Sequence, residues 1–131
     1  MILVDTSVLI DYFKGNQNNA TDKFQFILNS SVPFGINSLI FQEILQGSKT
    51  EKEFYILKTY LESQVFYEPE EGRTFFVKAA EIYFKCRKKG YQIGSAIDCI
   101  IAQTAITYDL KLLHHDKDFE TISQVVKLSF Y

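Results

Sequence analysis

The 131-residue sequence lacks a long hydrophobic run, a basic amino end and any cysteine pair with metal-binding spacing. Because no apolar stretch approaches the ~18–20 residues that cross a bilayer, we expect no membrane-spanning segment. The amino end carries Asp5 and Asp11 where a secretory signal would need Lys or Arg, so we expect a cytoplasmic protein. Cys86 and Cys99 both fall in predicted helices, and we expect reduced core thiols rather than a disulfide or a zinc site.

The sequence also has no internal repeat, no low-complexity tract and no linker rich in Pro, Gly or Ser. We therefore expect a single domain that spans residues 1–131. Hydrophobic residues make up 47% of the chain, and 12 Phe and 8 Tyr add aromatic bulk. This composition is sufficient for a packed interior and excludes intrinsic disorder.

The charge balance depends on where the acids lie. The chain has 14 Lys and Arg against 16 Asp and Glu, and the net charge of −2 argues against a general basic nucleic-acid binder. If four acids were gathered in one cation-binding site, the remaining surface would carry 14 basic and 12 acidic side chains. Lys85 and Arg87–Lys89 end a predicted helix, which the helix dipole explains; contact with RNA phosphates is the alternative.

Short apolar runs alternate with stretches of helical spacing along the chain. Strands are expected at 2–4, 33–36, 65–67, 111–114 and 125–130. Helices are expected at 8–13, 18–30, 39–45, 50–63, 73–89 and 96–108, with a turn of helix at 118–122. This alternation predicts an α/β fold in which helices cover a mainly parallel sheet.

Acidic residues follow or adjoin several of the predicted strands, and in parallel sheets ligands bind beyond the carboxyl ends of the strands. Asp5 ends the first strand, and Asp116 comes two residues after the strand at 111–114. Asp98 lies in the first turn of the helix that leads into that strand, and Glu43 lies on the helix after the second strand.

Each of these acids also has a purely structural explanation. Asp5 can cap a helix, Asp98 can interact with a helix dipole, and Glu43 can be an ordinary exposed helix residue. Asp116 and Asp118 can be turn formers. Taken together the acids indicate a bound cation, because crowded carboxylates repel one another and raise each other's pKa values unless a cation neutralises them. Oxygen ligands without paired His or Cys suit Mg²⁺ or Mn²⁺, which activate water for phosphodiester hydrolysis.

Four segments carry a resemblance to the PIN-domain family, and within it to the VapC-like ribonuclease toxins of toxin–antitoxin pairs. The segments cover nearly the whole chain in the family's order: 2–10 (ILVDTSVLI), 38–44 (SLIFQEI), 97–102 (IDCIIA) and 112–119 (LLHHDKDF). The resemblance implies a three-layer α/β/α sandwich with a mainly parallel central sheet of about four to five strands. It also implies an acidic quartet, which is both catalytic and metal-binding: Asp5, Glu43, Asp98 and Asp116.

The same resemblance implies one or two Mg²⁺ or Mn²⁺ ions at the quartet, with the Thr6 hydroxyl nearby and Asp118 as a further candidate. His114 departs from the Thr or Ser that the family often has two residues before its fourth acid. His114 and His115 point to opposite sides of a strand, so we interpret both as non-ligands.

The function implied is a metal-dependent endoribonuclease that hydrolyses RNA phosphodiester bonds as the toxin of a toxin–antitoxin pair. The expected partners are an RNA substrate, a VapB-like antitoxin and a second copy of the chain in a homodimer, with no membrane association. The alternative is a PIN-type nucleic-acid-binding or protein-binding module without hydrolysis. An aspartyl phosphotransferase is disfavoured, because that chemistry would require a second acid at the position of Ser7.

Overall fold

The computed structural model describes residues 1–70 and 72–131 and contains a four-stranded sheet. Its strands are β1 (Ile2–Val4), β2 (Phe34–Ile36), β3 (Val65–Phe66) and β4 (Lys111–Leu113). All pairings are parallel, and the strand order is β3-β2-β1-β4. The helices are α1 (Thr6–Phe13), α2 (Asn19–Asn29), α3 (Ser38–Gln46), α4 (Glu51–Glu62), α5 (Arg73–Lys88), α6 (Ala96–Thr107) and α7 (Lys117–Ile122).

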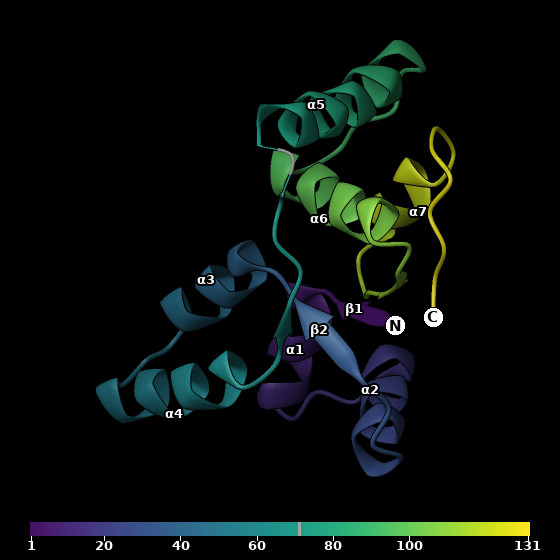
Figure 1. The fold of residues 1–131 in the computed structure, drawn as a ribbon. Coiled ribbons are helices and arrows are strands. Elements are labelled where there is room, and N and C mark those ends of the chain that lie inside the picture. The colour runs from purple at the N-terminus through teal and green to yellow at the C-terminus, as the bar shows by residue number, and fades with distance from the viewer. Residues whose placement is uncertain (71) are drawn as a thin grey trace.

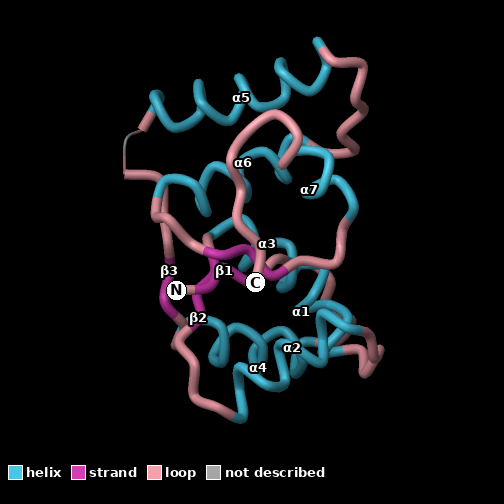
Figure 2. The backbone as a smooth tube through the Cα atoms, turned by 90° about the vertical axis from the view of Figure 1, so that its right-hand side faces the viewer, coloured by secondary structure: helices cyan, strands magenta, loops and turns pink. Residues whose placement is uncertain are grey.

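The helices form a layer on each side of the sheet. Helices α5, α6 and α7 lie on one side, and α1, α2, α3 and α4 lie on the other (Figures 1 and 2). Helix α6 packs against α5 and α7, while α1 packs against α2 and α3. The predicted three-layer α/β/α sandwich with a parallel central sheet is therefore confirmed.

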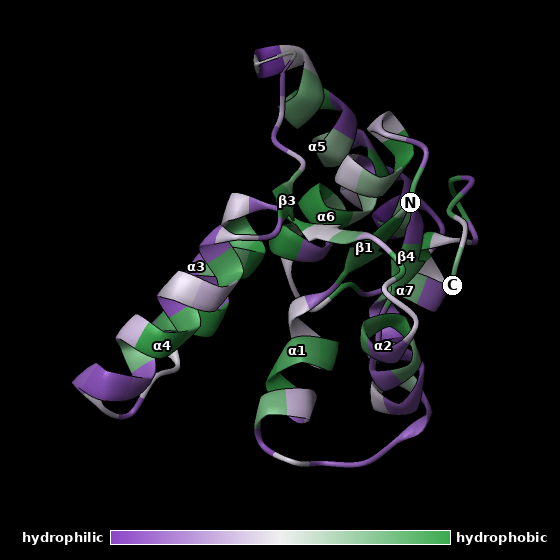
Figure 3. Ribbon diagram, turned by 60° about the horizontal axis from the view of Figure 1, so that its bottom comes forward, coloured by the Kyte–Doolittle hydropathy of each residue, from purple (hydrophilic) through white to green (hydrophobic). Residues whose placement is uncertain are grey.

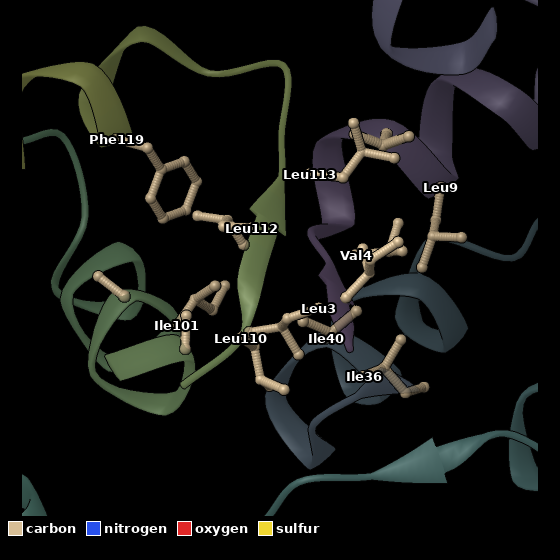
Figure 4. Close-up of a cluster of buried hydrophobic side chains, with 14 of the residues drawn as sticks. Leu3, Val4, Leu9, Ile36, Ile40, Ile101, Leu110, Leu112, Leu113 and Phe119 are labelled. Atoms are coloured by element: carbon tan, nitrogen blue, oxygen red, sulfur yellow. The ribbon is translucent and has the colours of Figure 1, made fainter. Parts of the chain in front are cut away.

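Apolar residues of the strands supply the centre of the core. Hydrophobic residues run along β1, β4 and α1 in Figure 3, and every residue of β1 is buried. Successive residues of β4 point to opposite faces of the sheet: Leu112 points toward Phe119 of α7, whereas Leu113 lies beside α1 (Figure 4). Cys86 and Cys99 are buried free thiols, as expected. Among the described residues, no helix combines the length and apolar character needed to cross a bilayer.

Gly35 permits the close packing of β2 against the segment that follows β3. A Cβ atom at this position would overlap the Tyr67 ring and would lie 2.8 Å from the carbonyl oxygen of Val65. Only glycine avoids both contacts at this point of the sheet.

The strand order creates a switch point between β1 and β4. From β1 the chain proceeds to β2 and β3 on one side, and it returns to add β4 on the other side of β1. Because all four strands are parallel, their carboxyl ends share one edge of the sheet. The loops that follow β1 and β4 therefore diverge at this edge, which is the usual position of a ligand site in an open parallel sheet.

The predicted strand at 125–130 is wrong. After α7 ends, the backbone N–H groups of Val125 and Val126 donate to the carbonyl of Ile122, which continues the chain as a turn. The only sheet pairing here, within the described part of the chain, is an isolated parallel bridge between Leu112 and Phe130. The β-branched residues of this segment instead pack, partly buried, against the core. Hydrophobic character placed the segment correctly against the core, but its first residues continue the turn after α7, and its end pairs with β4 only through the Leu112–Phe130 bridge.

Candidate active site

Three helices begin at the carboxyl edge of the sheet, each with an acid in or beside its first turn. Asp5 is the N-cap of α1, and its side chain accepts a hydrogen bond from the backbone N–H of Ser7. Asp116 is the N-cap of α7, and Asp98 is the third residue of α6, whose cap is Ser95. The partial positive charge of a helix N-terminus favours an acid at each of these positions. Local helix chemistry therefore brings three of the four predicted acids to one place.

Three carboxylates form a tight group within this site. Carboxylate oxygens of Asp98, Asp116 and Asp118 all lie within 4.8 Å of one another, and the three side chains are partly exposed. Asp116 Oδ1 accepts a hydrogen bond of 2.9 Å from the backbone N–H of Asp118. Asp118 Oδ2 accepts one of 2.9 Å from the backbone N–H of Gly94, in the loop before α6. The first bond caps α7, and the second holds the start of α7 against the loop before α6.

Asp5 lies deeper than the other acids, with 3% of its surface exposed. Its Oδ2 atom accepts hydrogen bonds from the Ser7 backbone N–H at 3.0 Å and from the Ser7 hydroxyl at 2.5 Å. The same hydroxyl accepts a 3.0 Å bond from the backbone N–H of His115, beyond β4. Ser7 therefore fixes the Asp5 carboxylate and ties the end of β1 to the segment that carries Asp116.

Glu43 approaches the site from α3 and is held by Thr6. The Thr6 hydroxyl donates a 2.7 Å hydrogen bond to Glu43 Oε1. Helix α3 is positioned by Asn37, whose side chain caps the Ile40 backbone N–H at 2.9 Å and donates to the buried Thr104 hydroxyl of α6 at 3.2 Å. Glu43 is not one of the three acids in the tight group, but it lies near enough to Asp5 to influence its titration.

The electrostatics of the site penalise ionised carboxylates. Burial, assisted by the charge of Glu43, raises the pKa of Asp5 from 3.8 to about 6, although the Ser7 hydrogen bonds act to lower it. Burial and the charges of Asp116, Asp5 and Asp118 raise the pKa of Asp98 from 3.8 to about 7. Helix capping alone would lower these pKa values. Burial is the larger cause for both groups, and at Asp98 the neighbouring carboxylates add to it.

His114 is engaged by neighbours on its own side of the sheet. Its ring lies 5.1 Å from the Phe119 ring centroid and 4.7 Å from that of Phe130. Nδ1 accepts a 3.2 Å hydrogen bond from the Asp116 backbone N–H, and Nε2 lies 3.3 Å from Glu120. Burial lowers the pKa of His114 against the opposing effect of Glu120. The ring therefore supports the backbone of Asp116 at the start of α7.

Two contributors were not identified from the sequence. The Ser7 hydroxyl joins Asp5 to the backbone N–H of His115, which is 108 residues from Ser7. The Gly94 backbone N–H holds Asp118. A serine two residues after Asp5 is typical of the start of a capped helix. The bond between the Ser7 hydroxyl and the His115 backbone N–H depends on the pairing of β1 with β4. Asp118, a further candidate from sequence, lies in the tight group.

The donor set fits a hard divalent cation. The candidate ligands are carboxylates, and no His or Cys belongs to the group of three among the described residues. Carboxylate oxygens without imidazole or thiolate are the ligands that Mg²⁺ and Mn²⁺ favour. A cation at this position would also offset the repulsion that raises the pKa of Asp98.

Comparison with known families agrees with the fold. A sequence model of the PIN domain matches residues 2–125, which include all five acids of the site. The chain belongs to the PIN-domain family. This PIN domain is 28% identical over 129 residues to the VapC ribonuclease Mb1587 of Mycobacterium bovis and to ribonuclease VapC11 of Mycobacterium tuberculosis. Each alignment covers 98% of this chain and 96% of the relative.

Solved structures share the fold of this PIN domain. VapBC2 from Rickettsia felis, bound to a DNA fragment from their promoter, matches with a TM-score of 0.75 and 17% identity. The match covers 100% of this chain and 98% of the other. VapBC-1 from nontypeable Haemophilus influenzae matches with a TM-score of 0.74 and 20% identity, over 100% of this chain and 97% of the other. At these identities the likeness establishes the PIN fold.

Proposed function

We propose that this PIN domain is a metal-dependent endoribonuclease that hydrolyses RNA phosphodiester bonds in the cytoplasm as the toxin of a toxin–antitoxin pair. The observation that carries the proposal is the group of Asp98, Asp116 and Asp118 within 4.8 Å, beside the buried Asp5, at the switch point of the sheet. Full-length similarity to two proteins named as VapC ribonucleases supports the same activity.

Each acid has a distinct task in this proposal. Asp98, Asp116 and Asp118 would hold Mg²⁺ or Mn²⁺, with Asp5 as a further candidate ligand. When bound, such an ion lowers the pKa of water and offsets the charge that develops on the phosphate oxygens. Glu43, held by Thr6, completes the acidic set. Glu43 remains outside the tight group, which leaves its carboxylate available to orient a water molecule or accept its proton.

Ser7 and His114 act as positioning residues. The Ser7 hydroxyl holds the Asp5 carboxylate through Oδ2, and it links this carboxylate to the segment after β4. His114 stabilises the backbone N–H of Asp116 at the start of α7. Neither group transfers a proton in this scheme; both fix carboxylates that would otherwise move apart under their mutual repulsion.

The partners follow from the structural relatives. The VapBC2 and VapBC-1 structures support a cognate VapB-like antitoxin for this chain, and we propose a homodimer as its second association. Exposed large apolar side chains on α4 and α5 are surfaces that partners would cover: Tyr55, Ile56, Phe76, Val77 and Phe84. Size-exclusion chromatography with light scattering tests the dimer directly.

Cleavage of a mixed pool of structured and single-stranded RNA by purified protein tests the activity. Reactions contain Mg²⁺, Mn²⁺ or a chelator, and the variants are Asp98→Asn and Asp109→Asn. Asp109→Asn is the control, because it makes the same chemical change at the opposite edge of the sheet. The φ of Asp109 is 53°, which Asn adopts readily. We expect cation-dependent cleavage by the wild type and Asp109→Asn, with no cleavage by Asp98→Asn. Folded wild-type protein that binds cation but cuts no RNA would instead favour a non-catalytic binding module.

Growth measurements test the role as a toxin. Expression of the wild type without an antitoxin should arrest growth, because hydrolysis depends on a complete acidic site. Expression of Asp5→Ala at the same level should not. Equal toxicity of the two proteins would show that growth arrest does not arise from catalysis.

A further inference from the structure

A surface cavity lies beside the acidic site, between the end of α5 and the start of α7. Its volume is about 810 Å³, within the range of ligand-binding pockets. The loop from residue 90 to 94, which connects α5 to α6, forms one wall. The lining residues are Tyr83, Arg87, Gly90, Tyr91, Gln92, Ile93, Gly94 and Lys117.

Two lining residues join this cavity directly to the acids. The Gly94 backbone N–H donates a 2.9 Å hydrogen bond to Asp118 Oδ2. Lys117 stands between Asp116 and Asp118 in the chain and is the first residue of α7. A ligand that filled the cavity would therefore lie next to the phosphate that the acidic group is proposed to act on.

The lining has the chemistry of a nucleotide site. It contains two cations and two tyrosine rings but no carboxylate. The Arg87 guanidinium lies 5.4 Å from the centroid of the Tyr83 ring, which holds the cation at the cavity wall. The ion pairs recorded for the described residues, Lys58–Glu62 and His114–Glu120, involve neither lining cation. Cations without a carboxylate partner suit phosphate, and the exposed Tyr91 ring suits a base that is free to stack.

A second cavity lies at the start of α7. Its volume is about 510 Å³, and its lining includes Lys23, Asp116, Lys117, Glu120 and the C-terminal Tyr131. Lys117 therefore lines both cavities. A single strand that crosses the acidic group can place a nucleotide in each cavity, whereas a compact ligand would occupy only one.

We propose that the cavity beside α5 binds a nucleotide of single-stranded RNA adjacent to the bond that is cut, with its base on Tyr91 and its phosphate on Arg87 and Lys117. This assignment rests on the proposed ribonuclease function. It makes Tyr91 and Arg87 determinants of where the RNA is cut, because the nucleotide they hold fixes the register of the strand across the acids.

The test compares Arg87→Ala with Lys88→Ala, since these neighbours carry the same charge on the same helix. The Lys88 ammonium lies over the Phe84 ring at 5.8 Å and does not line the cavity. Binding is measured by fluorescence anisotropy with a labelled 12-nucleotide single-stranded RNA of mixed sequence, in chelator. We expect Arg87→Ala to weaken binding roughly tenfold and to reduce the salt slope by about one, with Lys88→Ala within about twofold of wild type.

Tyr91 provides a second, uncharged readout. We expect Tyr91→Ala to weaken binding roughly tenfold and Tyr91→Phe to bind within about twofold of wild type, because stacking needs the ring and not the hydroxyl. In cleavage reactions Tyr91→Ala should also change the pattern of cut positions. Tyr91 is exposed, so neither substitution is expected to alter the thermal unfolding temperature, which is measured as the fold control.

The assay separates this proposal from the proposed function. Binding in chelator requires neither cation nor hydrolysis, so a difference between Arg87→Ala and Lys88→Ala supports the subsite even if no RNA is cut. Equal effects of the two substitutions, together with full binding by Tyr91→Ala, overturn the subsite even if the wild type cleaves RNA.

Discussion

Replacing Asp98 by Asn removes one carboxylate from the crowded site while keeping its size, and it should stabilise the protein in the absence of divalent cations. The pKa of Asp98 is raised from 3.8 to about 7, mainly by burial and then by the charges of Asp116 and Asp5. The ionised carboxylate is therefore disfavoured in the folded protein relative to the unfolded chain. Asparagine carries no charge and avoids this cost.

The pH dependence follows from the sign of that shift. Below about pH 4 the carboxyl group is protonated in both states, so the folded protein incurs no cost. As pH rises, the unfolded chain releases its proton first, and the folded protein loses stability until about pH 7. Each pKa unit corresponds to ~1.4 kcal/mol, but Asp98 is only half-buried and solvent screens its charge, which leaves roughly 1–2 kcal/mol.

That free energy is measurable as a difference in unfolding temperature. For a domain of this size, ~1–2 kcal/mol corresponds to roughly 3–8 °C. In chelator at about pH 8, Asp98→Asn should unfold at a temperature higher than the wild type by this amount, and at about pH 4 most of the difference should disappear. Addition of Mn²⁺ should reverse the order, because a cation at 100 times its dissociation constant adds ~2.7 kcal/mol to the protein that binds it.

Differential scanning calorimetry of the wild type and Asp98→Asn at these two pH values, with and without Mn²⁺, measures the unfolding temperatures. Asp109→Asn serves as the matched control and should follow the wild type under every condition. An Asp98→Asn variant that is less stable than the wild type in chelator at about pH 8 would refute the reasoning. In that case Asp98 would be a stabilising first-turn acid, and the crowding of the carboxylates would have no energetic consequence.

Three further predictions concern the supports of the site. Gly35→Ala should lower the free energy of unfolding by ~2 kcal/mol or more in urea titrations, because the added Cβ overlaps the Tyr67 ring. Ser7→Ala removes the hydroxyl that donates to Asp5, so the pKa of Asp5 should rise further and half-maximal Mn²⁺ binding should shift to higher pH. Asn37→Ala should cost ~1–2 kcal/mol in the same urea titrations and reduce the cleavage rate constant at saturating RNA, since it frees the start of α3.

Local patterns in the sequence were sufficient for most of the fold. The strands at 2–4 and 111–114 are short apolar runs that end at polar residues, and the helices carry recognisable caps such as Ser95. The segment at 125–130 failed because its β-branched residues favour a strand locally. Its actual course is decided by the turn that follows α7 and by the space left beside β4. That space is a tertiary property without a local signal.

The site was predictable in composition but not in arrangement. Spacing along the chain identified Asp5, Glu43, Asp98 and Asp116 as candidates, yet it could not show that Asp118 joins Asp98 and Asp116 in the tight group. That grouping depends on the hydrogen bond that holds α7 against the loop before α6. Helix periodicity gives the direction of a side chain within its own helix, whereas the packing of two helices sets the distance between their carboxylates.

The charge distribution reconciles an acidic chain with an RNA substrate. Removing the five acids of the site from the 16 in the sequence leaves 11, against 14 Lys and Arg. Without a cation, the site presents carboxylates that repel phosphate, while Arg87 and Lys117 attract it at the adjacent cavity. A bound cation removes the repulsion at the centre of this path and leaves the attraction at its side. The adjacent cavity would therefore hold a neighbouring nucleotide without the ion, whereas the scissile phosphate would approach the acids only when the cation proposed for hydrolysis is in place.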